Sequence, residues 1–285
     1  MIPGLPYALA AMLAFGVGDL IYKRGASAGA PPHQLMMVNA WVFAPTVILY
    51  GLATGSLHIN SGMAWGALVG VFMFVGFYNY AHSLRSGSVS INAPVFRLSF
   101  VITTVLAITF LHEAPTWPKF AGIALALAAV CLLLSGGAPP QAADKRAARS
   151  SLVRVLIATV AVGVGNTIYK LGLASGATPA SLIAAQACVV VTLSTGFAFS
   201  LDRRIQPGRA ALLHAPGSAV LLAIGFICMV ESLAMGEASV MVPIAQMGLA
   251  VTAVLGFFLL GERFTPRKAA GLLAALGALG CFAFG

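Results

Sequence analysis

The chain has 285 residues, of which 60% are hydrophobic and 8% are charged, with a formal net charge of +9 and a mean hydropathy of +0.96. An ordinary soluble domain carries about 25% charged residues, so this composition excludes a water-soluble globule, a disordered chain and a coiled coil, and most of the apolar surface must face lipid. The basic residues are scattered between apolar runs and form no continuous stripe, which argues against nucleic acid as a partner.

Ten apolar stretches approach the length of about 20 residues that a helix needs to cross a bilayer. The longest polar stretch divides the chain almost in half, which predicts two domains at 1–137 and 152–285 that are joined by a linker at 138–151. In chain order, the apolar stretches cover residues 5–24, 33–54, 63–84, 89–111, 118–135, 152–172, 180–201, 216–235, 239–260 and 267–284.

The two halves of the chain repeat each other in sequence. FGVGDLIYKRG at 15–25 matches VGVGNTIYKLG at 162–172, and later Pro94 matches Pro243 at a slightly larger shift. Because each half holds five helices, an odd number, the second half enters the membrane from the opposite side. The sequence therefore predicts an all-α integral membrane protein with ten transmembrane helices as two inverted five-helix repeats, an architecture that recurs in secondary transporters.

Basic residues are distributed unequally between the two sides of this predicted bundle. The loops after the odd-numbered helices carry thirteen of them, whereas the other side carries Lys119 and Lys170. Cytoplasmic loops are enriched in Lys and Arg. We therefore predict that the 138–151 linker is cytoplasmic and that both termini are periplasmic or extracellular.

Arg97 is the sharpest candidate for binding chemistry, because it lies near mid-depth in the fourth helix, where a charge is costly. Its counterpart in the second half is Gln246. A guanidinium offers a planar fork that suits a carboxylate, so we predict that Arg97 binds a substrate carboxylate and that Gln246 lies at the same site. The alternative is a structural pair between Arg97 and Glu231 or backbone carbonyls.

Two prolines occupy matching positions in the fourth and ninth helices. Pro94 and Pro243 each remove an intrahelical donor, which frees the carbonyl groups of Ser90 and Ser239 four residues earlier. A freed carbonyl in a membrane needs a partner or a water-lined cavity. We predict that these four residues form hinge or gating elements, and a simple kink satisfied by neighbouring helices is the alternative.

Further polar residues on the third and eighth helices are predicted to face into the bundle. Tyr78 and His82 are four residues apart and share one helix face, Asn79 lies beside them, and Glu231 aligns with His82 in the other half. We predict that they line the substrate path, and interhelical hydrogen bonding is the alternative. Trp41 and Tyr22 are predicted to stack on the substrate.

Asp19 and Lys23 are four residues apart on the first helix and can form an ion pair. Their counterparts in the second half are Asn166 and Lys170, where the acid is missing. Asp19 is therefore a candidate for proton coupling, and Glu231 is the other acid that lies deep in an apolar stretch.

Two more glutamates stand at the ends of the fourth and ninth helices. Glu113 and Glu262 precede Thr116 and Thr265, which are predicted to cap the helices that follow. We expect these residues to serve capping and loop packing. A Gly-x-Gly-Asp match at Asp19 lacks the second membrane-buried aspartate that a protease needs, so we expect no enzymatic activity, no metal site and no cofactor.

The doubled order of these residues resembles the EamA-type permeases of the drug/metabolite transporter superfamily over nearly the whole chain. The residues that carry the resemblance are Pro94, Glu113, Gly122, Pro243, Glu262 and Gly271. It implies a carrier or exporter of amino acids or other small metabolites in the bacterial inner membrane. It also implies cytoplasmic termini, which the charge distribution contradicts. The cavity that it implies carries over to Tyr78, Asn79, His82, Pro94, Arg97, Glu231, Pro243 and Gln246.

Together these features predict a secondary transporter or exporter of small amphiphilic metabolites, above all amino acids with aromatic or other apolar side chains. The two halves would rock around a midplane cavity in alternating access. The expected partners are a small-molecule substrate and the lipid bilayer, with the protein as a monomer or weak homo-oligomer. The alternatives are a multidrug or cationic-compound exporter and a passive channel.

Overall fold

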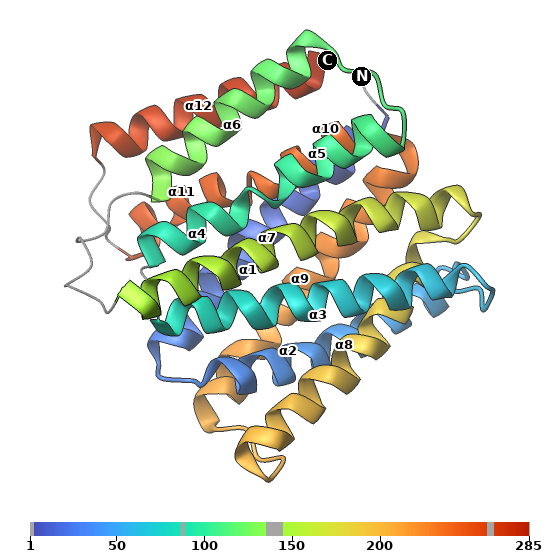
Figure 1. Cartoon of the computed structure of the whole chain (residues 1–285). Helices are drawn as coiled ribbons and strands as arrows, with labels where there is room; N and C mark the ends of the chain where they lie inside the picture. Colours follow the sequence, from blue (N-terminus) through green and yellow to red (C-terminus); the bar gives the residue numbers. More distant parts are fainter. Residues whose placement is uncertain (1–2, 87–88, 135–144, 261–264, 285) are drawn as a thin grey trace.

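A computed structural model of the chain describes residues 3–86, 89–134, 145–260 and 265–284, and these residues form twelve α-helices and no strand. The helices lie side by side across Figure 1, and the two termini lie close together. Their bounds are α1 Leu5–Ser27, α2 Pro32–Ala53, α3 Met63–Ser86, α4 Val89–Arg97, α5 Ser99–Phe110, α6 Trp117–Leu134, α7 Lys145–Ala174, α8 Pro179–Asp202, α9 Arg209–Met235, α10 Ala238–Gln246, α11 Gly248–Leu260 and α12 Pro266–Phe284.

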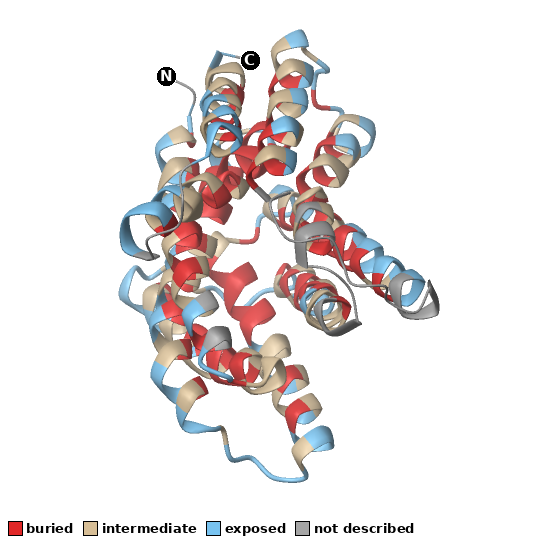
Figure 2. Cartoon of the chain, turned by 90° about the vertical axis from the view of Figure 1, so that its left-hand side faces the viewer, coloured by how far each residue is buried: buried red, intermediate tan, exposed pale blue. Residues whose placement is uncertain are grey.

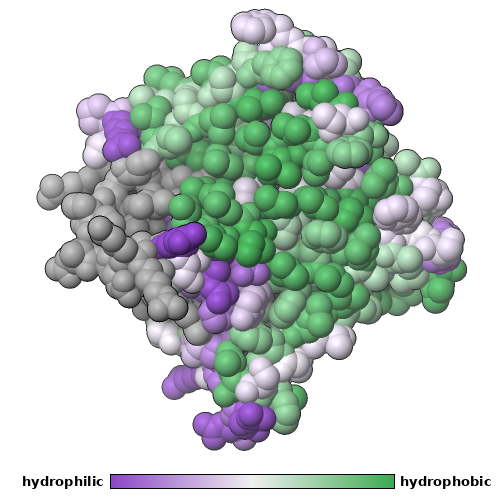
Figure 3. All heavy atoms as spheres, in the orientation of Figure 1, coloured by the Kyte–Doolittle hydropathy of each residue, from purple (hydrophilic) through white to green (hydrophobic). Residues whose placement is uncertain are grey.

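The outer surface of this bundle is apolar over most of the helix length. In the described residues, eight segments are long and apolar enough to cross a membrane, and two shorter apolar segments cover Val95–Phe110 and Trp117–Leu133. Figure 3 shows hydrophobic surface over the middle of the molecule and hydrophilic residues mainly toward the two ends of the helices. The exposed apolar band is the surface that a bilayer would cover.

Two of the predicted helices are interrupted in the middle. The predicted helix at 89–111 is divided into α4 and α5 at Leu98, and the one at 239–260 is divided into α10 and α11 at Met247. Each interruption comes four residues after the proline of its segment. The helix therefore continues past the proline and ends one turn later, so a continuous kinked helix was the wrong expectation for both.

Two other helices begin earlier than the apolar stretches indicate. α7 begins at Lys145, so the predicted linker at 138–151 is helical over its second part, and residues 135–144 lie outside the described chain. α9 begins at Arg209, seven residues before the predicted start at residue 216. Hydropathy marks the membrane boundary, whereas Arg, Lys and Ala continue a helix into the polar interface at little cost.

The most extensive helix contacts join the two halves of the chain. α1 packs along α9, α3 along α7, α2 along α8 and α6 along α12. In the sequence repeat, α1 corresponds to α7 and α3 corresponds to α9. The contact between α1 and α9 therefore has its equivalent in the contact between α7 and α3. The α2–α8 and α6–α12 contacts each join a helix to its own counterpart, and the halves therefore fold around each other rather than side by side.

Two close helix crossings repeat this exchange at the level of atoms. A Cβ added at Gly163 of α7 would lie 2.8 Å from the Ser99 carbonyl oxygen, and one added at Gly16 of α1 would lie 2.7 Å from the Gly248 carbonyl oxygen. A threonine hydroxyl lies at each crossing: Thr103 donates to the Gly163 carbonyl at 3.1 Å. Correspondingly, Thr252 donates to the Gly16 carbonyl at 2.8 Å. Small residues at such crossings let helix backbones approach closely in a membrane.

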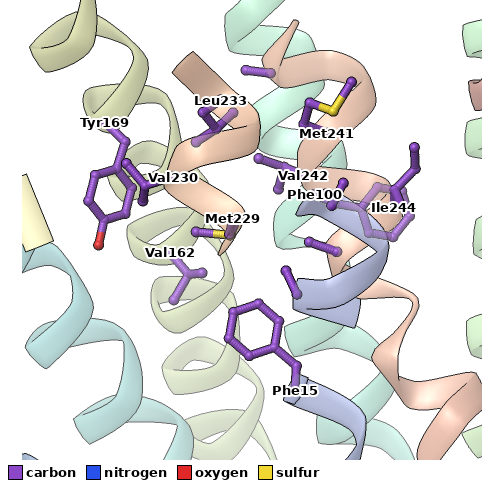
Figure 4. Packing of buried hydrophobic residues seen from close by; sticks show 14 of the residues in the cluster. Phe15, Phe100, Val162, Tyr169, Met229, Val230, Leu233, Met241, Val242 and Ile244 are labelled. Atoms are coloured by element: carbon purple, nitrogen blue, oxygen red, sulfur yellow. The ribbon is translucent and has the colours of Figure 1, made fainter. Parts of the chain in front are cut away.

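The core lies where the inner helices meet. Figure 2 shows buried residues gathered on the inward faces of the helices. Figure 4 shows Phe15, Phe100, Val162, Met229 and Met241 among the side chains that pack together there. These residues come from α1, α5, α7, α9 and α10, so the core is shared between the halves.

The Gly163 crossing generates a stability prediction. Gly163→Ala places a Cβ against α5, which forces α5 and α7 apart, and overpacking of this kind costs about 1–3 kcal/mol. We expect a lower thermal unfolding temperature for the purified protein in detergent. Gly196→Ala in α8 is the control, because nothing lies within 4 Å of an added Cβ there. Equal unfolding temperatures for both variants would contradict the close crossing.

Candidate functional site

Arg97 and Gln246, which are counterparts in the sequence repeat, contact each other across the halves. Arg97 is the last residue of α4, and its Nη1 atom donates to Gln246 Oε1 at 3.2 Å. Gln246 is the last residue of α10. The two helix interruptions therefore meet at this contact, and a cation at the C-terminus of α4 is favoured by the helix dipole.

Arg97 also forms an ion pair with Asp19 of α1 through its other terminal nitrogen. The proposed structural partner Glu231 is not the one that Arg97 uses. The Asp19 and Arg97 side chains keep 32% and 23% of their surface accessible. The pair is thus neutral as a unit, and both side chains keep part of their surface accessible. The side chain of Lys23, the expected partner of Asp19, lies outside the described part.

Two tyrosines lie beside this central cluster of Asp19, Arg97 and Gln246. Tyr22 and Tyr80 are close enough to Asp19 to interact with it electrostatically, and Tyr80 also interacts with Arg97 in this way. The Tyr80 ring stacks on Phe96, with ring centroids 4.1 Å apart. The sequence analysis named Tyr22 but missed Tyr80, which is separated from Tyr78 by about 200° around α3.

The central cluster is chemically asymmetric although the backbone around it is repeated. The counterpart of Asp19 is Asn166, which is buried and whose side-chain Nδ2 atom donates to the Thr103 hydroxyl at 3.5 Å. The counterpart of Arg97 is neutral Gln246. Both charges therefore come from the first half, while the second half supplies amides. A duplication by itself does not require this difference.

Tyr78 and His82 lie in a different place from the central cluster. The Tyr78 ring centroid lies 4.6 Å from that of His82 and 4.8 Å from that of Phe197 in α8. Together with Pro32 and His33 at the start of α2, they border a cavity of about 10 Å³, which has room for about one water molecule. This face of α3 packs against α2 and α8, and its role in substrate binding stays a prediction.

The remaining predicted site residues make contacts away from the central cluster, within α3 or between other helices. The Asn79 side chain donates to the Val75 carbonyl at 2.9 Å, and Trp41 Nε1 donates to the Thr195 hydroxyl of α8 at 2.9 Å. The Glu231 carboxylate accepts a hydrogen bond of 3.1 Å from Tyr50 of α2. None of these contacts reaches the central cluster, so the structure divides the predicted site into several separate pairs.

The four predicted hinge residues are only partly described. Pro243 and Ser239 are buried in α10, and the Ser239 hydroxyl has no hydrogen-bond partner among the described residues. The backbones of Pro94 and Ser90 lie in α4, but their side chains are outside the described part. Hinge motion at these positions stays a prediction, and the nearest interruptions are at Leu98 and Met247.

One end of the bundle is held by a second charged cluster that the sequence analysis did not anticipate. Buried Glu113 accepts hydrogen bonds from the backbone N–H groups of Ala238 at 2.7 Å and Ser239 at 2.9 Å, so it caps α10 in the other half. Lys119 forms an ion pair with Glu237 in the α9–α10 loop. Lys170 donates to the Leu233 and Gly236 carbonyls, both at 2.6 Å.

The expected capping residues have mixed outcomes. Thr265 accepts a hydrogen bond of 3.3 Å from the Lys268 N–H group and so caps α12. The Thr116 hydroxyl is buried and makes no hydrogen bond to a described residue, so the expectation that it caps α6 was wrong. Glu113 caps a helix as expected, but that helix is α10 rather than its own neighbour. Glu262 lies outside the described residues.

Polar contacts also join the halves at the opposite end. Asp202 at the end of α8 accepts hydrogen bonds from His33 at 3.0 Å and from Gln34 at 2.8 Å. Gln34 in turn accepts a bond of 2.8 Å from the Gly208 N–H group before α9. Among the described residues, no group of three or more His, Cys, Asp or Glu side chains could hold a metal ion.

The family to which the chain is similar matches each of the two repeated halves separately. The sequence profile of the EamA-like transporter family matches residues 2–135 and again residues 149–284. A protein of Enterococcus faecalis (strain ATCC 700802 / V583) named "Putative sugar uptake protein" is 26% identical over 276 residues, which cover 92% of this chain and 90% of that protein. A solved crystal structure is similar with a TM-score of 0.82 at 14% identity over 98% of this chain and 95% of that chain, and at this identity it shows the fold alone.

The Glu113 cap generates a prediction for stability. Glu113→Gln removes the charge and one of the two acceptor oxygens at the start of α10, and loss of a cap of this kind costs about 1–2 kcal/mol. We expect a lower unfolding temperature in detergent. Thr109→Ala is the control, because the Thr109 hydroxyl bonds only within its own exposed helix turn. An unfolding temperature for Glu113→Gln that matches the control would contradict the cross-half cap.

Proposed function

This chain belongs to the EamA-like transporter family, and from that premise we propose that it moves small polar metabolites of no net charge by alternating access at the central cluster. It is a multi-pass membrane protein and a transporter of small metabolites. The observation that carries the proposal is the contact of Asp19, Arg97 and Gln246 where the two interrupted helices meet. Broken helices at a repeat interface are a recurring feature of transporter binding sites.

The proposed arrangement is ten transmembrane segments in two inverted five-helix repeats. α4 with α5 and α10 with α11 each supply one segment, and α6 completes the ten. The exchange of halves in the helix packing and the paired crossings at Gly16 and Gly163 support this proposal. The two halves would then be related by a pseudo-two-fold rotation that exchanges Arg97 with Gln246.

Zwitterionic amino acids fit the chemistry of the central cluster best. Arg97 offers a guanidinium to a carboxylate, and Asp19 offers a carboxylate to an ammonium group. A zwitterion that enters between them replaces one ion pair with two and adds no net charge to the membrane interior. Tyr22 and Tyr80 lie beside the pair and suit an apolar or aromatic side chain.

Substrate binding would be coupled to the position of α4. Arg97 holds α4 against α1 through Asp19 and against α10 through Gln246. A substrate that engages Arg97 competes with both contacts and so weakens the hold between the two interrupted helices. The charged cluster at Glu113 and Lys119 and the polar contacts of Asp202 lie at opposite ends of the bundle, where closing contacts are needed in alternation.

A sugar is the second candidate substrate. The Enterococcus relative is named for sugar uptake, and the carboxylate, guanidinium, amide and phenol groups of the central cluster can all hydrogen-bond to hydroxyl groups. A cationic compound is less suited, because Arg97 already neutralises Asp19. We further propose that the chain works in the bacterial inner membrane as a monomer or weak homo-oligomer, since one chain contains the whole cluster.

Counterflow in liposomes tests the proposed site and substrate. We expect purified protein to exchange labelled leucine or phenylalanine, and the double variant Asp19→Asn/Arg97→Gln to lose exchange by about 10- to 100-fold. Loss of a charge-assisted hydrogen bond costs about 1.5–3 kcal/mol, and 1.4 kcal/mol corresponds to a tenfold change. Arg204→Gln, an exposed residue after α8, is the control that keeps normal exchange.

Three outcomes of this assay would change the proposal. Exchange by the double variant within twofold of the unaltered protein would remove the central cluster from the site. Counterflow driven by glucose and not by amino acids would select the sugar candidate. Flux that does not saturate and shows no counterflow stimulation would indicate a channel.

Orientation is tested by tags in intact cells. From the excess of basic residues at the linker end we expect a tag after the C-terminus to be labelled from outside. A tag inserted between residues 138 and 144 is expected to be labelled only after permeabilisation. The reverse pattern would show cytoplasmic termini, the arrangement that the family resemblance implies.

A further inference from the structure

A surface cavity between α3 and α7 lies apart from the central cluster. It has a volume of about 510 Å³ and is lined by Asn79 of α3 and by Arg149, Ser150, Val153, Arg154 and Ile157 of α7. The five residues of α7 are spaced so that they share one helix face. Ligand sites in proteins span about 300–1,000 Å³, so this cavity has room for a molecule larger than water.

The charge in this cavity is positive and incompletely satisfied. Arg154 makes one weak contact among the described residues, 3.5 Å from its Nη1 atom to the Asn79 side-chain oxygen. Asn79 uses its amide nitrogen on the Val75 carbonyl. Arg149 and Ser150 are exposed, and no acidic residue lies among the residues that line the cavity. Two guanidinium groups therefore converge on a space that holds no described anion.

The depth of the two arginines points to a ligand at the membrane interface. Arg149 begins the apolar span of α7, and Arg154 lies five residues further in, about 7.5 Å along the helix. A guanidinium at this depth on a lipid-facing surface needs a polar partner. Figure 3 shows hydrophilic side chains that interrupt the hydrophobic surface toward the end of the molecule where α7 begins.

The apolar part of the cavity continues in the direction of the bilayer. Val153 and Ile157 line it, and they keep 49% and 44% of their surface exposed. Leu156 and Val160 extend this exposed apolar face of α7 by another turn. Val153 lies between the two arginines along α7, whereas Leu156, Ile157 and Val160 follow Arg154. The residues beyond the second arginine on this face are thus apolar, as the acyl chain follows the headgroup in a phospholipid.

We infer that this cavity binds one anionic phospholipid, with its phosphate held by Arg149 and Arg154 and its acyl chain along Val153 and Ile157. Basic pockets between transmembrane helices on the cytoplasmic side are suited to anionic headgroups. The paired guanidinium groups and the absence of acids among the lining residues select an anionic lipid over a zwitterionic one. The bound lipid would fasten α3 to α7, one of the helix pairs that join the two halves.

The test uses the full chain in detergent, with phosphatidylglycerol and phosphatidylcholine of identical oleoyl chains as probes. We expect phosphatidylglycerol to raise the unfolding temperature and to remain bound in native mass spectrometry at one copy per chain. Arg149→Gln/Arg154→Gln should weaken that binding at least tenfold. Arg204→Gln/Arg209→Gln, which removes one exposed arginine after α8 and another at the first position of α9, is the matched control and should bind as the unaltered protein does.

Several results would overturn the inference. Equal binding of phosphatidylglycerol by the two double variants would show that the cavity is not the site. Equal stabilisation by phosphatidylcholine would show that charge is not recognised, and equal stabilisation by inorganic phosphate would indicate a free-anion site. If Arg149→Gln/Arg154→Gln does not fold, Ser150→Asp places a like charge on the exposed rim and should also weaken binding tenfold; unchanged binding by that variant would overturn the inference.

Discussion

The hydrogen bond from Arg97 to Gln246 is the contact on which the central architecture depends, because it joins the two points where membrane helices are interrupted. An interrupted helix exposes backbone groups that hydrocarbon cannot satisfy. Two interruptions that meet in the interior can share polar side chains and any polar ligand that enters. Arg97 forms an ion pair with Asp19 there, so the two residues together carry no net charge. The site proposed for a polar substrate thus uses the same residues that lie at the two helix interruptions.

The two halves share the helix crossings around the central cluster, but they differ in the polar side chains that they contribute to it. The crossings at Gly16 and Gly163, each with its threonine hydroxyl, are reproduced when the halves are exchanged. The polar residues near them are not reproduced, because Asp19 is charged and pairs with Arg97, whereas its counterpart Asn166 is neutral. Close helix crossings tolerate little change in volume, whereas a partly accessible polar position can change its charge and thereby its ligand.

The two ends of the bundle are closed by different chemistry. Glu113 caps α10 across the halves, and Lys119 pairs with Glu237 in the next loop. At the other end, Asp202 is held by neutral or titratable donors, Gln34 and His33. Both sets of contacts join the halves, so alternating access as proposed would open one set while it keeps the other. The lipid cavity on α7 lies beside this second end.

Sequence alone determined that the chain is a membrane protein, the approximate positions of most apolar helices and the internal repeat, because apolar segment length and matched residues are local or one-dimensional signals. It did not determine the interruptions at Leu98 and Met247 or the early starts of α7 and α9. It also selected Arg97, Gln246, Asp19 and Tyr22, since charged and polar groups deep in apolar stretches are rare. Only the tertiary structure decided which side chains form ion pairs and hydrogen bonds with each other. Arg97 meets Asp19 rather than Glu231, Glu113 caps a helix in the other half, and Tyr80 rather than Tyr78 faces the central cluster. These pairings depend on how helices rotate and cross, which side-chain spacing along one helix does not specify.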